Sequence, residues 1–493
     1  MRINHLPVII ISISLLAVSS QCKKKADPDS TGFRIIADAV KKNRSALYLN
    51  VSGHPEESNS LPIGVFDSGT GGLSVLNSIL ELDKFNNTTR EPGSDGLPDF
   101  FSEKFIYLAD EANMPYGRYD SEGKADFLRE LVIKDVLFLM GNRYYLSPEK
   151  RKPEKDKQPV KSVVIACNTA TAFGLEDARN AMDRWGLGVE ILGIIEAGAK
   201  EAVDCIPEED IDKAVVGILA TEGTCASMSY PSTVKRVFST KYPDKDIPVV
   251  QQAGIGLAGA IDGDINYLDP SISRVRSESE YFGPALGHPE YPIEQRLWDE
   301  YNFETGNCLL VMRNIEGEIF KVQLNSVTNY VRYMITHLVS SIADQYPDCS
   351  LDAIILGCTH YPFVEDKIRG HLKYLKSYSD KYRNIISDKV ELIDPAESLG
   401  IELYKELGRN DLHGKNQQED SKFFISVPNP VLRENLIDDI GEFPYSWKYG
   451  RETNSSLEYV KRVPFSESNI KPDVLERIKQ DLPTCYSLIT LNF

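Results

Sequence analysis

Short runs of apolar residues that end in small polar residues recur along the chain. In the stretch Leu351–Pro362, the apolar residues Ala353–Leu356 lead directly into Gly357, and an unbroken run of this length predicts a strand buried on both faces of a parallel sheet. Similar runs predict strands at 62–66, 104–108, 163–166, 189–195, 214–219, 249–252, 389–394 and 423–427. Helical spacing, as in 127–140 and 327–346, separates these runs. The alternation predicts an α/β fold with parallel sheets.

Two of the predicted strands end in a cysteine that is followed by small polar residues. The first strand leads into Cys167, Asn168 and Thr169, and the second leads into Cys358 and then Thr359 and His360. Ligands bind at the carboxyl edge of open α/β sheets, where these residues would lie. If the helices that follow begin at these polar residues, each thiol lies near a helix N-terminus, which favours thiolate. Two such thiols facing one substrate could act as two bases.

Two other interpretations of these cysteines remain open at this point. A cysteine at the end of a buried strand is often an inert small apolar residue. Cys358 and His360 are also possible zinc ligands, but they lack the clustered Cys-x-x-Cys spacing that is typical of zinc sites. The repetition of the pattern in two strands favours catalysis.

Composition sets the class of protein. The chain has 493 residues, of which 42% are hydrophobic and 26% are charged, as in soluble globular proteins with two or three domains. Its formal net charge of -18 argues against a general nucleic-acid binder, which needs a basic surface. The 8 cysteines are scattered without paired spacing, so no disulfide framework is expected.

The N-terminus has the pattern of an export signal. An apolar segment, Leu6–Val18, is too short for a membrane-spanning helix, and small residues then lead to Cys22. Residues 1–22 are therefore expected to form a signal or lipoprotein-like segment with a lipid anchor at Cys22, which suggests a membrane-anchored protein of the cell envelope. An uncleaved anchor or a wrongly assigned start are the alternatives. The polar residues 23–61 are expected to be a linker, with a short helix near 33–42.

Other strand ends carry candidate binding groups. The glycine-rich turn that follows Asp67 could cradle an anion, although Asp67 could equally cap a helix, and the full nucleotide-binding motifs are missing. A Pro-Tyr-Gly turn could present the Tyr116 ring and backbone amides to a ligand, or it could be a plain loop with a packed tyrosine. Glu196 could act in acid/base chemistry or simply hold a loop. Residues 262–321 are too long and irregular for a connection and predict an inserted subdomain, lid or partner-binding element. The polar segment 429–493 gives no structural prediction.

Together, the motifs resemble those of the glutamate racemase family, which belongs to the cofactor-independent aspartate/glutamate racemases. The matching stretches follow the family's order and span the core from Pro62 to Leu407, without the insertions. They are IGVFDSGTGGLSVL, YLADEANMPYGR, VVIACNTATA, ILGIIEAGAK, GILATEGT, DAIILGCTHYPF and VELIDPAES.

The resemblance implies two similar α/β domains with the active site in the cleft between them. The first domain is expected at 62–190, completed by about 359–428. The second is expected at 191–358, with the insertion at 262–321, and 429–493 is expected to be a C-terminal extension. Neither a cofactor nor a metal is implied. The implied partner is a small-molecule amino acid, glutamate, rather than nucleic acid, and a homodimer is compatible with the resemblance.

The resemblance also assigns roles to individual residues. Cys167 and Cys358 would be the two acid/base residues, assisted by Asp67 and His360, with Glu196 near the site. The expected substrate-binding residues are Asp67, Ser68, Tyr116, Gly117, Asn168, Thr169, Thr224, Thr359 and His360. The implied reaction removes the Cα proton on one face and returns a proton on the other, which would supply D-glutamate for peptidoglycan.

The sequence departs from the family pattern in several places. Ala197 and Ala220 stand where the family usually has proline and glycine, and both changes are mild. The export signal conflicts with the cytoplasmic use of D-glutamate. Two alternatives therefore remain, which are a racemase of another amino acid such as aspartate and a non-catalytic ligand-binding lipoprotein of the envelope.

Overall fold

A computed structural model describes most of the chain. It covers residues 33–43, 45–55, 59–261, 263–278, 280–415, 418–431, 436–437, 441–455, 457–470 and 472–490. The predicted signal segment, including Cys22 and its lipid anchor, lies outside the described residues. Within the described part of the chain, no helix is both long enough and apolar enough to cross a membrane.

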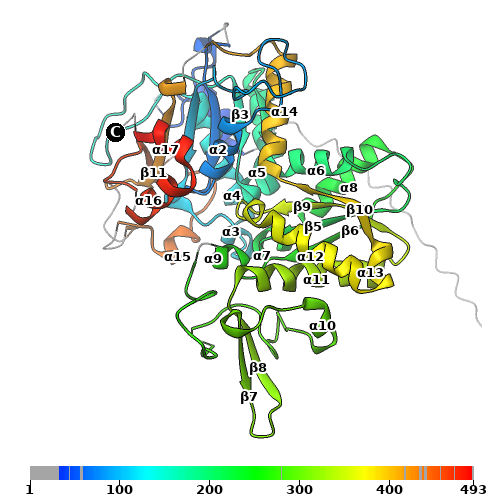
Figure 1. Ribbon diagram of the computed structural model, residues 1–493. Coiled ribbons are helices and arrows are strands. Elements are labelled where there is room, and N and C mark those ends of the chain that lie inside the picture. Colours follow the sequence, from blue (N-terminus) through cyan, green and yellow to red (C-terminus); the bar gives the residue numbers. More distant parts are fainter. Residues whose placement is uncertain are drawn as a thin grey trace, which may run out of the picture.

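The first of two large sheets forms the N-terminal domain (Figure 1). Its strands, in spatial order, are β12 (Val460–Pro464), β11 (Lys422–Pro428), β2 (Phe105–Ala109), β1 (Ile63–Asp67), β3 (Ser162–Ile165) and β4 (Glu190–Gly193). All neighbours are parallel except β12, which runs antiparallel to β11 at the edge. Every residue of β1, β2 and β3 is buried, as expected for strands covered on both faces.

The second sheet forms the other domain and is entirely parallel. Its strands, in spatial order, are β10 (Ile386–Ile393), β9 (Ser350–Gly357), β5 (Ala214–Ala220) and β6 (Val249–Ala253). The predicted α/β fold with parallel sheets is therefore confirmed. The expectation that 359–428 completes the first domain is confirmed for β11, which joins the first sheet, but not for 359–393, because β10 pairs with β9 in the second sheet. The reason is that the helices between β9 and β10 form a crossover connection within one sheet.

Helices cover both sheets. The longer ones are α1 (Arg34–Lys41), α2 (Leu73–Glu81), α4 (Ala125–Met140), α5 (Asn168–Trp185), α6 (Ile194–Asp204), α8 (Ser229–Lys241), α11 (Val327–Gln345), α12 (Glu365–Tyr378), α14 (Pro395–Arg409), α16 (Pro472–Asp481) and α17 (Pro483–Thr490). The shorter ones are α3 (Arg118–Ser121), α7 (Glu222–Ala226), α9 (Leu257–Ile261), α10 (Trp298–Tyr301), α13 (Asp380–Ile385) and α15 (Tyr445–Lys448). Helix α14 contacts both α2 and α6, so it joins the two domains.

A β-hairpin that begins in the predicted insertion 262–321 and ends at Leu324 projects from the second domain (Figure 1). Its strands are β7 (Leu309–Arg313) and β8 (Ile319–Leu324), which pair antiparallel. The tip residue Ile315 is fully exposed to solvent. The hairpin therefore extends beyond the two sheets rather than completing either one.

Two segments for which little structure was expected are packed into the first domain. In the predicted linker 23–61, the short helix α1 is confirmed, but Ile35 and Ile36 are buried, and the Trp185 indole donates to the Ile36 carbonyl at 3.0 Å. Burial of each isoleucine stabilises the folded state by about 1.5–3 kcal/mol. A free tether would not gain this stabilisation. In the segment 429–493, β12 joins the first sheet and α17 packs on α2.

Candidate active site

Cys167 lies at the carboxyl end of β3 and is itself the N-cap of α5. Its Sγ accepts a hydrogen bond from the Ala170 backbone N–H at 3.4 Å and lies 3.5 Å from Ser68 Oγ, to which the thiol donates. The residue is 7% exposed. The sequence predicted that Asn168 or Thr169 begins the helix, and α5 does begin at Asn168, so the predicted position of this thiol near a helix N-terminus is confirmed.

Asp67, at the end of β1, lies beside this thiol. Its Oδ2 accepts backbone hydrogen bonds from Gly69 at 3.0 Å and Gly72 at 3.1 Å. Two amides of the glycine-rich turn therefore hold the protein's own carboxyl group. A Cβ on Gly72 would lie 2.4 Å from the Asp67 Cβ, so only glycine allows this approach.

Burial raises the pKa values of both Cys167 and Asp67. Burial raises the pKa of the Cys167 thiol to about 12, and the nearby Asp67 carboxyl adds to this increase. Burial also raises the pKa of Asp67, despite its hydrogen bonds from Gly69 and Gly72. Cys167 is therefore a thiol at neutral pH, and the neighbouring carboxyl group can exchange a proton with it.

Cys358 lies at the carboxyl end of β9 with a different proton partner. Its Sγ is 3.5 Å from the His360 Nδ1, which also lies 3.5 Å from the Thr359 hydroxyl. A short 3-10 turn, Tyr361–Val364, follows, and the long helix α12 begins only at Glu365. The prediction that a helix begins at Thr359 is therefore wrong, because the turn that contains Pro362 precedes the helix. The imidazole of His360, rather than a helix N-terminus, is the group next to this thiol.

The two cysteine-bearing strand ends meet between the domains. The Tyr230 hydroxyl of α8 donates to the Asn168 Oδ1 at 3.1 Å. A small cavity of about 10 Å³ is lined by Asn168, Tyr230, Cys358, Thr359 and Asp394. This cavity places the residue that follows Cys167 beside Cys358, as an active site shared by two domains requires.

A larger cavity of about 630 Å³ opens at the same place. The glycine-rich turn of the first domain lines it with Thr70 and Gly71, and the second domain lines it with Thr359 and His360. Helix α16 forms a further wall with the side chains of Glu476, Arg477, Ile478, Gln480 and Asp481. A segment that gave no structural prediction therefore lines the cleft between the two domains.

The two predicted binding residues of the Pro-Tyr-Gly turn, Tyr116 and Gly117, face different parts of the structure. An added Cβ on Gly117 would lie 4.0 Å from the Thr169 hydroxyl, so the backbone of this turn lies next to α5. The Tyr116 hydroxyl points instead into the first domain, 2.6 Å from Asp110 and 2.7 Å from Asp135. Because Tyr116 is 1% exposed, its side chain cannot contact a ligand as predicted, and only its backbone can.

Glu196 was predicted at a strand end as an acid/base group, but it lies in the first turn of α6. Its carboxylate accepts from Arg179 at 2.7 Å and from Arg236 at 2.8 Å. Burial alone would raise the pKa of Glu196, but these two guanidinium groups hold it below the usual value. The carboxylate is therefore fixed in its charged form by ion pairs, which does not fit a role in proton transfer.

Thr224, the remaining predicted binding residue, lies in α7 just after β5. Its hydroxyl is 3.0 Å from that of Thr221, which caps the same helix. Ala220, at the end of β5, pairs with Gly357, so α7 follows a strand end that adjoins the Cys358 strand.

Two residues near the cysteines were not predicted. Tyr230 bonds to Asn168 from the first turn of α8, and its sequence gave no signal of this contact. Asp394 stands in the matching stretch VELIDPAES, which could have indicated it, and burial raises its pKa to about 6.

Neither a metal cluster nor a disulfide occurs in the described part of the chain. Its cysteines Cys167, Cys205, Cys225, Cys308, Cys349, Cys358 and Cys485 are free thiols. No group of three His, Cys, Asp or Glu side chains among these described residues could hold a metal ion.

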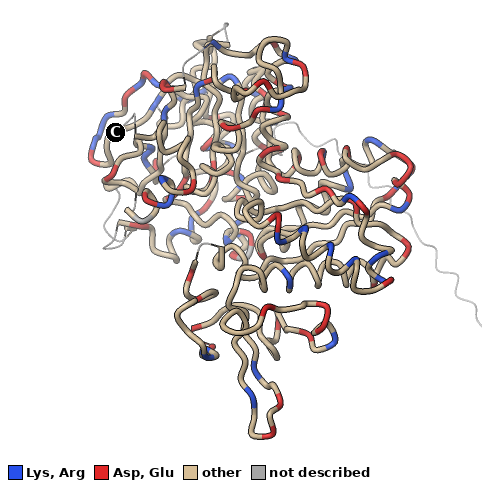
Figure 2. Tube along the Cα trace, viewed as in Figure 1, with Lys and Arg blue, Asp and Glu red and all other residues tan. Residues whose placement is uncertain are grey.

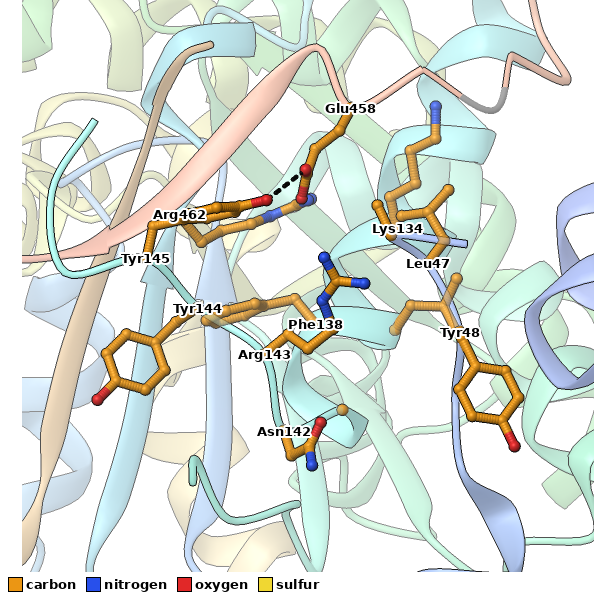
Figure 3. A pocket seen from close by; sticks show the side chains of 13 residues that line it. Leu47, Tyr48, Lys134, Phe138, Asn142, Arg143, Tyr144, Tyr145, Glu458 and Arg462 are labelled. Carbon is orange, nitrogen blue, oxygen red and sulfur yellow. Dashed lines mark hydrogen bonds between the residues drawn. The ribbon is translucent and has the colours of Figure 1, made fainter. Parts of the chain in front are cut away.

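Another cavity, of about 40 Å³, lies between α4 and β12 (Figure 3). It is lined by Phe138, Tyr145, Glu458 and Arg462, and the Tyr145 hydroxyl donates to Glu458 at 2.6 Å. None of the predicted site residues lines it. The interdomain cavities are therefore the candidate active site.

Comparisons with known proteins agree with the motifs. The glutamate racemase of Pseudomonas putida is 25% identical over 378 residues, which cover 76% of this chain and 93% of that protein. Glutamate racemase 2 of Caldanaerobacter subterraneus is 23% identical over 368 residues, covering 75% and 89%. No family model matches the chain.

Solved structures of glutamate racemases are also similar to this chain. That of isoform RacE1 from Bacillus anthracis is 22% identical with a TM-score of 0.40, and it covers 74% of this chain and 86% of that chain. That of Francisella tularensis, in complex with D-glutamate, is 19% identical with a TM-score of 0.39, covering 80% and 96%.

Proposed function

We propose, from the premise that this chain is a relative of the glutamate racemases in the aspartate/glutamate racemase superfamily, that it is an isomerase that interconverts L- and D-glutamate without a cofactor. The observation that carries the proposal is the approach of two cysteine-bearing strand ends, one from each domain. Asn168, which follows Cys167, lines the same small cavity as Cys358. Two opposed proton-transfer groups are what inversion at Cα requires.

The proposed reaction uses the two cysteines as opposite bases. One thiolate removes the proton from Cα on one face, and the other cysteine donates its thiol proton to the opposite face. The bond between Cα and hydrogen breaks on one side and forms on the other, so the groups exchange roles when the reaction runs backward. In the next turnover, each sulfur starts in the protonation state that the reverse reaction needs.

The surroundings of the two sulfurs support different starting states. Burial raises the pKa of Cys167 to about 12, so Cys167 begins as the acid. The His360 Nδ1 lies 3.5 Å from the Cys358 Sγ, and we assign Cys358 as the base in this direction. For the reverse direction, Asp67 is the neighbouring group that can take the Cys167 proton.

The intermediate is a carbanion beside a carboxylate, and it needs fixed hydrogen-bond donors. Ser68, Asn168, Thr169 and Thr359 supply neutral donors around the two thiols, and α5 directs its N-terminal backbone amides to the same region. Such donors stabilise developing negative charge without a permanent countercharge. We therefore assign these residues to binding of the amino acid and its carbanion.

The experiment that tests the activity is circular dichroism of the reduced full chain with L-glutamate and, separately, with D-glutamate. Both signals should decay to zero, because the two enantiomers have equal free energies. The enantiomers of aspartate serve as the comparison substrate and should react more slowly. A constant signal with both glutamate enantiomers, from folded protein, would contradict the proposal and favour another amino acid or a binding role.

We also propose that the D-glutamate formed is used for peptidoglycan. A D-glutamate auxotroph that carries this chain should grow without added D-glutamate, and the same strain carrying the Cys167→Ala variant should not. Equal growth with both chains would contradict a biosynthetic role that depends on the racemase activity.

A further inference from the structure

The C-terminal extension, residues 429–493, contacts the turn that contains Tyr116 and Gly117. Three of its side chains bind the segment just before Tyr116. The Lys448 ammonium donates to the Met114 carbonyl at 2.8 Å, and the Tyr449 hydroxyl donates to the Pro115 carbonyl at 3.3 Å. These bonds attach two consecutive carbonyls of the turn to one short piece of the extension, at α15.

The third side chain, Arg451, is buried and makes the closest bond. Its Nη2 donates to the Asn113 Oδ1 at 2.6 Å and to the Tyr119 hydroxyl at 3.1 Å, on either side of Tyr116. The guanidinium group also lies over the Phe127 ring at 4.9 Å and the Phe443 ring at 4.7 Å. The Arg451 Nε also donates to the Lys448 carbonyl at 3.2 Å. A buried, stacked guanidinium with three acceptors has a fixed position, unlike a solvated arginine.

A second buried link from the extension ends on Tyr116 itself. Arg462 of β12 donates to the Asp135 Oδ1 at 3.0 Å, and the Asp135 Oδ2 lies 2.7 Å from the Tyr116 hydroxyl. That hydroxyl is also 2.6 Å from Asp110, but it carries only one proton. One of the two carboxyl groups must therefore be protonated to satisfy both contacts, and burial raises the pKa of Asp135 to about 8.

The other side of the same turn faces the candidate active site. Gly117 approaches Thr169, two residues after Cys167. The Asp110 backbone N–H, at the start of this loop, donates to the Asp67 carbonyl at 2.9 Å. The turn is thus placed between the extension and the groups assigned to proton transfer and substrate binding.

We propose that Arg451 is a positioning residue for the racemase reaction, and that with Lys448 it holds the Tyr116–Gly117 backbone at the distance from Thr169 that amino-acid binding needs. This inference rests on the proposed function and deepens it. The extension acts on the substrate through the backbone of the turn, because Arg451 does not itself line the interdomain cavities. Loss of the contacts should weaken binding of both enantiomers and leave the chemical step nearly unchanged.

The test compares KM and kcat in three single variants of the full chain. Arg451→Lys keeps the buried charge but cannot span both Asn113 and Tyr119, and it should raise KM for L- and D-glutamate about tenfold with kcat within about threefold. Lys448→Met removes one bond from a more exposed position and should raise KM about two- to threefold. If the Arg451 variant does not fold, the Lys448 variant still tests the inference.

The matched control is Lys461→Met. Lys461 is a buried lysine of the same extension, and it donates to the carbonyls of Pro148 at 2.6 Å and Lys150 at 2.8 Å, in a different loop. Its variant should lower Tm without changing KM. Wild-type KM in the Arg451 and Lys448 variants, or an equal increase in all three, would overturn the inference and leave the proposed function standing. A wild-type chain that does not racemise glutamate would overturn both.

Discussion

At the scale of single residues, the role of Asp67 in proton transfer can be tested by a conservative substitution. Its Oδ2 accepts the Gly69 and Gly72 backbone N–H groups, and an asparagine oxygen can accept the same bonds. Asp67→Asn should therefore fold, while the proton partner of Cys167 is lost. We expect kcat to fall about 10²- to 10⁴-fold, as for loss of a general acid or base.

The Asp67 measurement includes an internal check. The equilibrium constant for racemisation is one, so kcat/KM must fall equally for L- and D-glutamate in any variant. A thermal melt of the asparagine variant within a few degrees of wild type would show that the fold is retained. Wild-type kcat in that variant would contradict the assigned role.

Asp135 predicts how stability depends on pH. An aspartate in an unfolded chain has a pKa of about 3.9, and burial, together with Asp110, raises the Asp135 pKa to about 8 in the folded protein. The folded state therefore binds more protons between these values, so stability from this group is complete below about pH 4 and is lost as the pH rises to about 8. Arg462 and the Tyr116 hydroxyl, which face the same carboxyl group, oppose this effect.

The variant Asp135→Asn removes the titrating proton and keeps an acceptor for Arg462. We expect the decrease in Tm between about pH 5 and pH 8 to be smaller in this variant than in the wild type. Asp110 remains in place in both proteins, so the difference between the two curves reports Asp135. Parallel curves would contradict the raised pKa.

The sequence could place the cysteines, but not every partner. The cysteine and Asp67 positions followed from apolar runs that end in polar residues, a local signal. The Tyr116 hydroxyl is bonded inside the domain, to Asp110 and to Asp135 of α4, and the Glu196 carboxylate is paired with Arg236 of α8. A short sequence motif does not show which residues of other segments its side chains will contact.

At the scale of elements, the end of β9 depends on a glycine. A Cβ on Gly357 would lie 2.9 Å from both the Ala220 Cβ and the Tyr230 ring. Gly357→Ala therefore forces a shift that moves Cys358 or Tyr230, and Tyr230 is bonded to Asn168. We expect a loss of about 1–3 kcal/mol in unfolding free energy, typical of overpacking, together with a decrease in kcat.

The control for this substitution is Gly370→Ala in the interior of α12. No atom lies within 4 Å of an added Cβ there, so the change should be neutral or stabilise the protein by up to about 1 kcal/mol. Denaturant unfolding and kcat measure both effects. Equal stability and activity in the two alanine variants would show that the β9 end tolerates a side chain.

The sequence predicted the helices and strands whose buried residues are apolar, and it did not predict a strand whose buried residues are charged. The buried strands read as apolar runs, and the long helices as periodic ones. Strand β12 has the sequence VKRVP, and its Lys461 and Arg462 are buried against carbonyls and a carboxylate. Because such charged positions look solvent-exposed in a sequence, the hydrophobic pattern could not reveal this strand.

At the scale of the whole molecule, acidic and basic residues are interspersed over both domains (Figure 2). The formal net charge is -18, and glutamate carries a net negative charge, so the long-range field opposes its entry. Among the described residues that line the larger cavity, Arg477 of α16 is the one with an arginine or lysine side chain. Glu476 and Asp481 line the same cavity, so the Arg477 charge counters part of the local negative charge as well as the repulsion of the substrate.

Charge reversal at this position should raise KM. We expect about a fivefold increase for Arg477→Glu, which corresponds to about 1 kcal/mol. Lys479→Glu changes the net charge equally, but Lys479 does not line the cavity and lies 3.7 Å from Glu476 on the same helix. Its KM should stay within about twofold of wild type at the same ionic strength. Equal KM values in both variants would show that α16 does not act locally.

The central claim is that one cysteine from each domain transfers a proton on opposite faces of Cα. Its most direct test is the reaction of L-glutamate in D₂O, followed by ¹H NMR of the Cα proton and by circular dichroism. Early in the reaction, the D-glutamate formed should carry deuterium at Cα and the remaining L-glutamate should keep its proton. Cys167→Ala and Cys358→Ala should each form no D-glutamate, and the control Cys205→Ala should retain activity. Racemisation by either active-site variant, or deuterium entering the remaining L-glutamate as fast as D-glutamate appears, would contradict the two-base account.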